Sequence, residues 1–96
     1  MRIALVIGSA VSTMKDDQLH GRKLLLVREA DEAGQPAGPV QVAVDTVSAG
    51  AGDLVIVTAG SSARHTALTQ NAPVDLVIVG VIDSLETGGR VTFRKS

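Results

Sequence analysis

Two serines and a histidine lie within one short stretch, residues 60–65 (GSSARH), and they have the most scope for catalysis in this chain. A serine becomes a nucleophile when a base, itself held in place by a third group, accepts its proton. Here the candidate base, His65, lies within a single turn of both serines, and no strand-to-helix elbow motif surrounds them. We therefore expect no catalytic residues in this stretch.

The same stretch has the composition of an anion site. Ser61 or Ser62 is a good N-cap for a helix over residues 62–70, whose first N–H groups would be free. Together with the serine hydroxyls and the guanidinium of Arg64, such N–H groups can bind an anion. In a single copy, however, helix capping and a structural salt bridge explain these residues better than a ligand does.

A second glycine-rich turn covers residues 49–52 (AGAG). It differs from a phosphate-binding loop because it lacks the Gly-Lys-Ser/Thr ending and leads into an expected strand, where a dinucleotide-binding turn would open a helix. The two histidines, His20 and His65, are far apart in the sequence and have no third ligand at a suitable spacing. We expect neither a cofactor nor a metal site.

Composition argues against a nucleic-acid partner. The chain of 96 residues is 45% hydrophobic but 1% aromatic, and Phe93 is its one aromatic residue. Single-stranded nucleic acid is bound largely by stacking bases on aromatic side chains, and its phosphates require a basic face. With a net charge of −1 and interspersed signs, the chain offers neither feature.

The chain contains no cysteine, so it has no disulfide framework and no thiolate chemistry. Its longest uncharged apolar run, residues 76–82, is too short to span a bilayer, and the first residues lack the pattern of a signal peptide. We expect a cytoplasmic protein without a membrane partner.

The elements that must position these residues are mostly strands. Short β-branched runs punctuated by glycine predict a mainly β fold. The expected strands cover residues 2–14, 23–30, 40–45, 54–58, 74–83 and 91–94, with a bend or bulge at Gly8 and a loop over residues 31–39. We expect one domain, residues 1–96, built as a small five-stranded OB-like β-barrel with one short helix and a C-terminal β-hairpin.

Two of these strands carry further information. Val40, Val42 and Val44 alternate with smaller or polar residues, so we expect the three valines to face the core. The strand at 54–58 is apolar on both faces and lies between the two glycine turns. Such turns suggest close approach of the backbone to a ligand or to another copy of the chain. A small aliphatic chain commonly covers its apolar surface by oligomerising.

Several segments, taken together in order and spacing, resemble the bacterial microcompartment vertex proteins of the EutN/CcmL family along essentially the full length. The matching segments are Arg2–Gly8, Leu19–Leu24, Val44–Val47 leading into Ala49–Asp53, Gly60–Arg64 and Pro73–Asp83. Ser48 departs from the family pattern, which usually has glycine there.

The resemblance implies a structural shell protein that is not an enzyme. It implies a homopentamer that caps the vertices of a polyhedral shell in the cytoplasm, next to hexameric shell proteins. The serine-rich turn and the short tail over residues 87–95 favour a catabolic compartment over a carboxysome. The alternative that stays open is a small-anion or nucleotide-binding β-barrel, with or without enzymatic activity.

Repetition around a five-fold axis would give both glycine turns a role. Five helix starts near an axis would focus positive potential into a narrow pore. We therefore predict that the following residues lie at or near this pore: Gly60, Ser61, Ser62 and Arg64. The residues that we predict at the subunit interface are Ala49, Gly50, Gly52 and Arg64.

Overall fold

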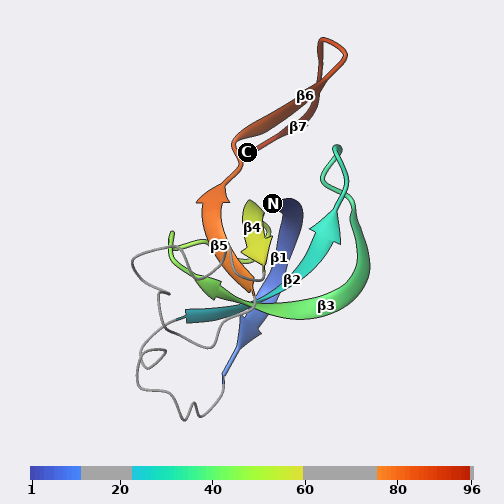
Figure 1. Cartoon of the computed structure of the whole chain (residues 1–96). Helices are drawn as coiled ribbons and strands as arrows, with labels where there is room; N and C mark the ends of the chain where they lie inside the picture. Colours follow the sequence, from blue (N-terminus) through green and yellow to red (C-terminus); the bar gives the residue numbers. More distant parts are fainter. Residues whose placement is uncertain (12–22, 60–75, 96) are drawn as a thin grey trace.

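The computed structural model describes residues 1–11, 23–59 and 76–95, and these contain seven β-strands (Figure 1). The strands are β1 (Arg2–Ala10), β2 (Lys23–Ala30), β3 (Pro36–Asp45), β4 (Leu54–Ala59), β5 (Leu76–Val81), β6 (Ser84–Thr87) and β7 (Arg90–Arg94). Strands β1 to β5 close into a barrel, and β6 and β7 form a separate hairpin. The predicted five-stranded barrel with a C-terminal hairpin is confirmed. The helix predicted over residues 62–70 lies outside the described residues.

One parallel pair closes the barrel. Neighbouring strands follow the order β1-β2-β3-β5-β4, and β4 returns to pair with β1. The pairs are antiparallel except for β3 with β5, where Val44 lies opposite Val77. Closure gives each barrel strand two neighbours, which removes the open sheet edges that otherwise promote aggregation.

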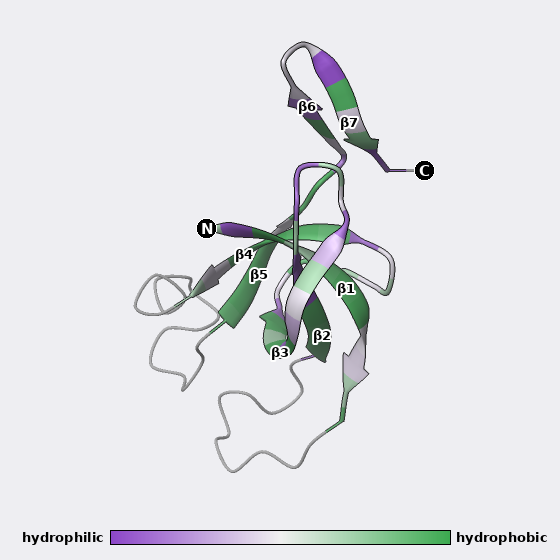
Figure 2. Ribbon diagram, turned by 90° about the vertical axis from the view of Figure 1, so that its right-hand side faces the viewer, coloured by the Kyte–Doolittle hydropathy of each residue, from purple (hydrophilic) through white to green (hydrophobic). Residues whose placement is uncertain are grey.

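The interior of the barrel is filled with aliphatic side chains. The inward-facing residues, each at most 2% exposed, are Ala4, Val6, Leu25, Val27, Ala43, Val55, Val57 and Ile78. Most of β1 and β5 is correspondingly hydrophobic in Figure 2. A barrel of so few strands has room for little more than its own side chains. Its interior is therefore a packed core rather than a ligand cavity.

A β-bulge bends β1. Val6 lies opposite Val27 of β2, but the next pair is Gly8 with Leu26, so Ile7 has no partner across the ladder and is 42% exposed. The bend predicted at Gly8 is confirmed as this bulge. A bulge increases the local twist of a strand, which helps a short sheet to close.

The start of β3 differs from its prediction. The strand begins at Pro36 rather than at Val40, so the glycine and proline expected to end the loop belong to the strand. The turn before it is tight because the Asp31 carboxylate accepts hydrogen bonds from the N–H groups of Ala33, at 2.9 Å, and Gln35, at 3.0 Å. Such an Asx turn reverses the chain within a few residues.

The orientation of β3 was also predicted incorrectly. Val40 and Val42 are 52% and 51% exposed, whereas Ala43 is buried in the core. Alternation shows which residues share a face of a strand, but the register with the neighbouring strand decides which face points inward. Ala43 lies opposite Leu25, a core residue of β2, and this pairing turns Val40 and Val42 outward.

Candidate functional site: an assembly surface

The glycine turn at residues 49–53 uses its own backbone N–H groups internally. The N–H of Gly50 donates to Oδ2 of Asp53 at 2.9 Å, and the N–H of Asp53 donates to the Gly50 carbonyl at 3.0 Å. The N–H of Gly52 donates to the Val6 carbonyl of β1 at 2.8 Å. Since these three donors are already bonded within the molecule, they are not available to hold a phosphate. The turn therefore has a structural role: its N–H groups hold it together and attach it to β1.

Two side chains tie the segment before this turn to the barrel. Nζ of Lys23, at the start of β2, donates to the Ala49 carbonyl at 2.8 Å. Oγ1 of Thr46 donates to the Ile78 carbonyl of β5 at 2.7 Å. The Asp45 carboxylate accepts the N–H of Val47 at 3.0 Å, which is the Asx-type bonding expected where a strand ends. The segment is therefore fixed against both β2 and β5.

Ser48 lies in this segment with φ of 60°, in the left-handed region that residues with a side chain rarely adopt. Replacing Ser48 with glycine should raise the free energy of unfolding by roughly 0.5–1 kcal/mol, because left-handed strain costs about 1–2 kcal/mol and the entropy of glycine offsets part of the relief. Urea unfolding followed by circular dichroism measures the change. Ser84→Gly, at an exposed serine of β6, is the control and should lower stability. If the Ser48→Gly variant is no more stable than the wild type, the left-handed conformation of Ser48 does not strain the backbone.

The outside of the barrel carries an apolar surface that we call the valine face, formed by Leu26 of β2 with Val40 and Val42 of β3. Leu26 lies opposite Val42, and both point away from the core residues that alternate with them. Further along the same side, Val44 packs with Val77, Leu24 and Val79 in a cluster separate from the core. Exposed apolar side chains grouped in this way mark an interaction site.

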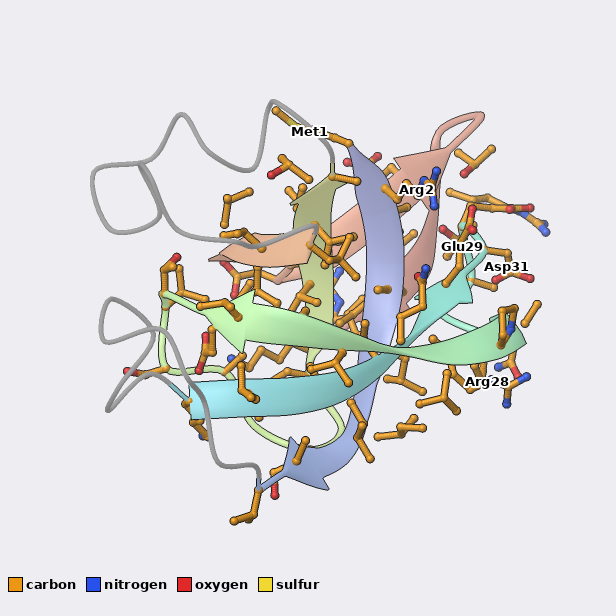
Figure 3. All side chains as sticks on the ribbon, turned by 60° about the horizontal axis from the view of Figure 1, so that its bottom comes forward. Met1, Arg2, Arg28, Glu29 and Asp31 are labelled. Carbon is orange, nitrogen blue, oxygen red and sulfur yellow. The ribbon has the colours of Figure 1, made fainter. Side chains whose placement is uncertain are left out.

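A second outer surface is a shallow cleft at the beginning of β1, which we call the β1 cleft. Its lining consists of Met1, Arg2, Ile3, Glu29, Ala30 and Ile56. Ile3 lies opposite Ile56 across the β1–β4 ladder, so the floor is apolar. Arg2 and Glu29 lie close together on one side of β1 and give the rim one positive and one negative charge (Figure 3).

The structure describes only part of the predicted site. Gly60, Ser61, Ser62 and Arg64 lie outside the described residues, so their position near an axis stays a prediction. The side chain of Ala49 is 1% exposed and packs in the core of its own subunit. Gly50 is partly exposed and Gly52 is exposed, and their contact with another subunit also stays a prediction.

The sequence did not identify either outer surface as a candidate site. The alternating valines were recognised, but they were assigned to the core. Nothing in the sequence brings Ile3 and Ile56 together, because they are far apart in the chain and meet only through the β1–β4 register. Both surfaces depend on strand pairing, which local patterns do not specify.

These features define a class of protein: a small closed β-barrel with a filled interior and apolar surfaces outside, suited to assembly. In residues 1–11, 23–59 and 76–95, no three metal-binding side chains of the His, Cys, Asp or Glu type are grouped together. Nor does the described part of the chain contain a helix with the length and apolar character needed to cross a membrane.

Comparison with known proteins identifies the family within this class. Residues 1–83 match the family described as ethanolamine utilisation protein EutN/carboxysome. The microcompartment shell vertex protein EutN of Escherichia coli strain K12 is 40% identical, over 99% of this chain and 100% of its own length. The chain belongs to the EutN/CcmL family.

Two solved structures agree with this assignment. The carboxysome-type protein CcmL of Gloeobacter violaceus has a TM-score of 0.91 and 40% identity, over 99% of this chain and 98% of its own. The pentameric microcompartment shell protein GrpN from Rhodospirillum rubrum has a TM-score of 0.80 and 46% identity, over 91% of this chain and 99% of its own. The fold is therefore shared with relatives from more than one kind of microcompartment.

Proposed function

We propose that the chain is a structural vertex protein of a bacterial microcompartment shell in the cytoplasm, and that it assembles as a cyclic pentamer without catalytic activity. The observation that carries this proposal is the valine face. Val40 and Val42 are about half exposed on the outside of a barrel whose interior is already filled. Contact with another copy would remove this surface from water, and the relative GrpN is described as pentameric.

A closed ring also needs two different surfaces on each subunit, because a head-to-tail contact joins unlike patches. The valine face lies on β2 and β3, and the β1 cleft is lined by residues at the beginning of β1, the end of β2 and in β4. The presence of two such surfaces at different places on the barrel supports a ring over a two-fold dimer. Five-fold rings placed among flat hexameric shell proteins would supply the curvature that closes a shell.

The stretch at residues 60–64 completes the proposal. Gly60, Ser61, Ser62 and Arg64 would lie near the five-fold axis, where five copies of a helix start would attract anions. Gly50 and Gly52 would lie at the subunit interface. This placement is supported by the positive charge of Arg64 and by the glycine and serines before it, which favour a turn and a helix start.

The alternative was a small-anion or nucleotide-binding barrel. One candidate phosphate loop was the turn at residues 49–52, but three N–H groups of this turn and of Asp53 donate within the protein. The other candidate anion site, residues 60–64, lies outside the described residues. Where the structure describes it, the barrel interior is packed with aliphatic side chains rather than with polar groups that converge on a pocket. We therefore do not favour this function.

Oligomer mass tests the proposed function. The wild-type protein should have a native mass five times the 9.8 kDa of one chain, measured by native mass spectrometry and checked by light scattering. The mass should stay unchanged on dilution through the micromolar range if the apolar surfaces are buried in a stable ring. A stable monomer would contradict the proposal.

A further inference from the structure

One edge of β3 is open along most of its length. Among the described residues, β3 pairs with β5 only at its last two residues, Val44 and Asp45. The earlier part of the strand pairs with β2, and in Figure 1 it curves away from β5. Residues 37–42 are all exposed. The edge of this part that points away from β2 is therefore accessible to another chain.

The sequence of this part of β3 is suited to pairing with another strand. Residues 36–44 (PAGPVQVAV) carry no charge. Val40, Gln41 and Val42 are all exposed although neighbouring side chains of a strand face opposite ways, so water reaches both faces. An uncharged, valine-rich strand with an open edge is a place where copies of a chain pair and aggregate. This part of β3 therefore needs protection that closure of the barrel does not provide.

A bulge interrupts the open edge just before the valines. Arg28 of β2 lies opposite Val40. The next pair is Ala30 with Pro36, so residues 37–39 of β3 face a single residue of β2. We call residues 37–39 the β3 bulge. A bulge twists the edge of a strand away from the straight line that a second strand needs for pairing.

The backbone groups of the β3 bulge cannot continue a ladder. Gly38 has φ of 82°, far from the values of an extended strand, and Pro39 has no N–H to donate. The Gly38 carbonyl is already in use, because Nε of Arg28 donates to it at 2.9 Å. Figure 3 shows Arg28 beside the beginning of β3. An approaching strand would therefore meet one missing donor and one acceptor that is already bonded.

We infer that the β3 bulge and Arg28 together prevent β3 of one copy of this chain from pairing with β3 of another copy. The inference goes beyond the proposed function, because it concerns a contact that a closed ring must avoid. Pairing between two equivalent edges would link rings to one another in particles without a defined size. The β3 bulge blocks the backbone edge but leaves the side chains of Val40 and Val42 available for the proposed ring contact.

Deleting Gly38 and Pro39 tests the inference. The deletion places Ala37 opposite Glu29 and brings the pairs on both sides of the β3 bulge into one register, so β3 becomes an unbroken strand. Sedimentation velocity should then show particles heavier than the wild-type assembly, in a share that rises with protein concentration. The wild-type mass should stay constant over the same range. A deletion variant that is folded by far-UV circular dichroism and keeps the wild-type mass would overturn the inference.

A cysteine in place of Gln41 identifies the strands that meet, because the chain has no cysteine of its own. Gln41 lies within the exposed part of β3, and antiparallel pairing of two copies would bring these parts together. After oxidation, Gln41→Cys alone should give mainly single chains on a non-reducing denaturing gel. The same substitution in the deletion variant should raise the share of linked pairs several-fold. Equal linking in the two proteins, or heavy particles without linked pairs, would overturn the inference.

A charge on the open edge is the matched control. Gln41→Lys in the deletion variant leaves the valine face unchanged, and in paired copies it would bring like charges together. This substitution should therefore restore the wild-type mass. Heavy particles that persist with the lysine present would overturn the inference, because their formation would not depend on the edge of β3.

A second variant keeps the length of the chain. Arg28→Ala/Pro39→Val frees the Gly38 carbonyl and supplies the missing N–H, and it decides by the same measurements if the deletion variant does not fold. The proposed function is tested separately by the mass of the wild type. A monomeric wild type whose Gln41→Cys form links only after the deletion would contradict the pentamer and support the role of the β3 bulge.

Discussion

Replacing Val42 with aspartate should leave the chain folded but unable to form the proposed pentamer. Val42 is 51% exposed on the single barrel, so a carboxylate there remains hydrated and costs the fold little. In the ring the same carboxylate would be buried at every subunit contact, at a cost of about 2 kcal/mol or more for each. That corresponds to a roughly thirtyfold weaker contact. Native mass should fall to one chain, while the far-UV circular dichroism stays that of the wild type.

The matched control for this variant is Val11→Asp. Val11 is a fully exposed valine that is not part of the valine face, so its replacement should leave the pentamer intact. Val40→Asp is a second test of the same face and should behave like Val42→Asp. If both variants on the valine face keep a pentameric mass, the valine face is not the subunit contact.

Replacing Gly34 with alanine should lower the free energy of unfolding by about 2–4 kcal/mol. Gly34 has φ of 80°, and an added Cβ would lie 2.9 Å from Cδ1 of Phe93. The left-handed conformation of Gly34 contributes about 1–2 kcal/mol of this loss. The clash of the new Cβ with the Phe93 ring contributes about 1–2 kcal/mol more, because the ring is held at the base of the hairpin of β6 and β7. Urea unfolding gives the total.

Gly38→Ala separates the two contributions. Gly38 has φ of 82° but no atom within 4 Å of an added Cβ, so its replacement should show the strain alone. Phe93 is the one aromatic residue of the chain, and its near-UV circular dichroism should weaken in Gly34→Ala but not in Gly38→Ala. Equal losses of stability in the two variants would contradict the close packing of Phe93 on Gly34.

Much of the barrel was predictable because its signals are local. Glycine and Asx residues select turns and bends through their own φ values and side-chain bonds, so the C-terminal hairpin and the bend at Gly8 were expected correctly. β-Branched runs favour strands through packing of neighbouring side chains on a pleat. The absence of aromatic and basic surfaces correctly directed attention to self-association.

The assembly surfaces were harder to predict because they depend on strand register. The alternation of Val40, Val42 and Val44 was visible, but it does not distinguish the inner from the outer face of a barrel. Only the pairing of Ala43 with Leu25 turns Val40 and Val42 outward, while Val44 is buried against Val77. The predicted start of β3 was wrong for a related reason, since Pro36 is tolerated at the first position of a strand.

By itself, the sequence determined the mainly β fold, the small aliphatic core and the C-terminal hairpin, because these depend on residues close together in the chain. Tertiary structure alone decided three other features: the exposure of Val40 and Val42, the cleft floor formed by Ile3 and Ile56, and the contact of Phe93 with Gly34. Each of these joins segments distant in sequence. Their contact follows from the register and closure of the whole barrel, which no local pattern contains.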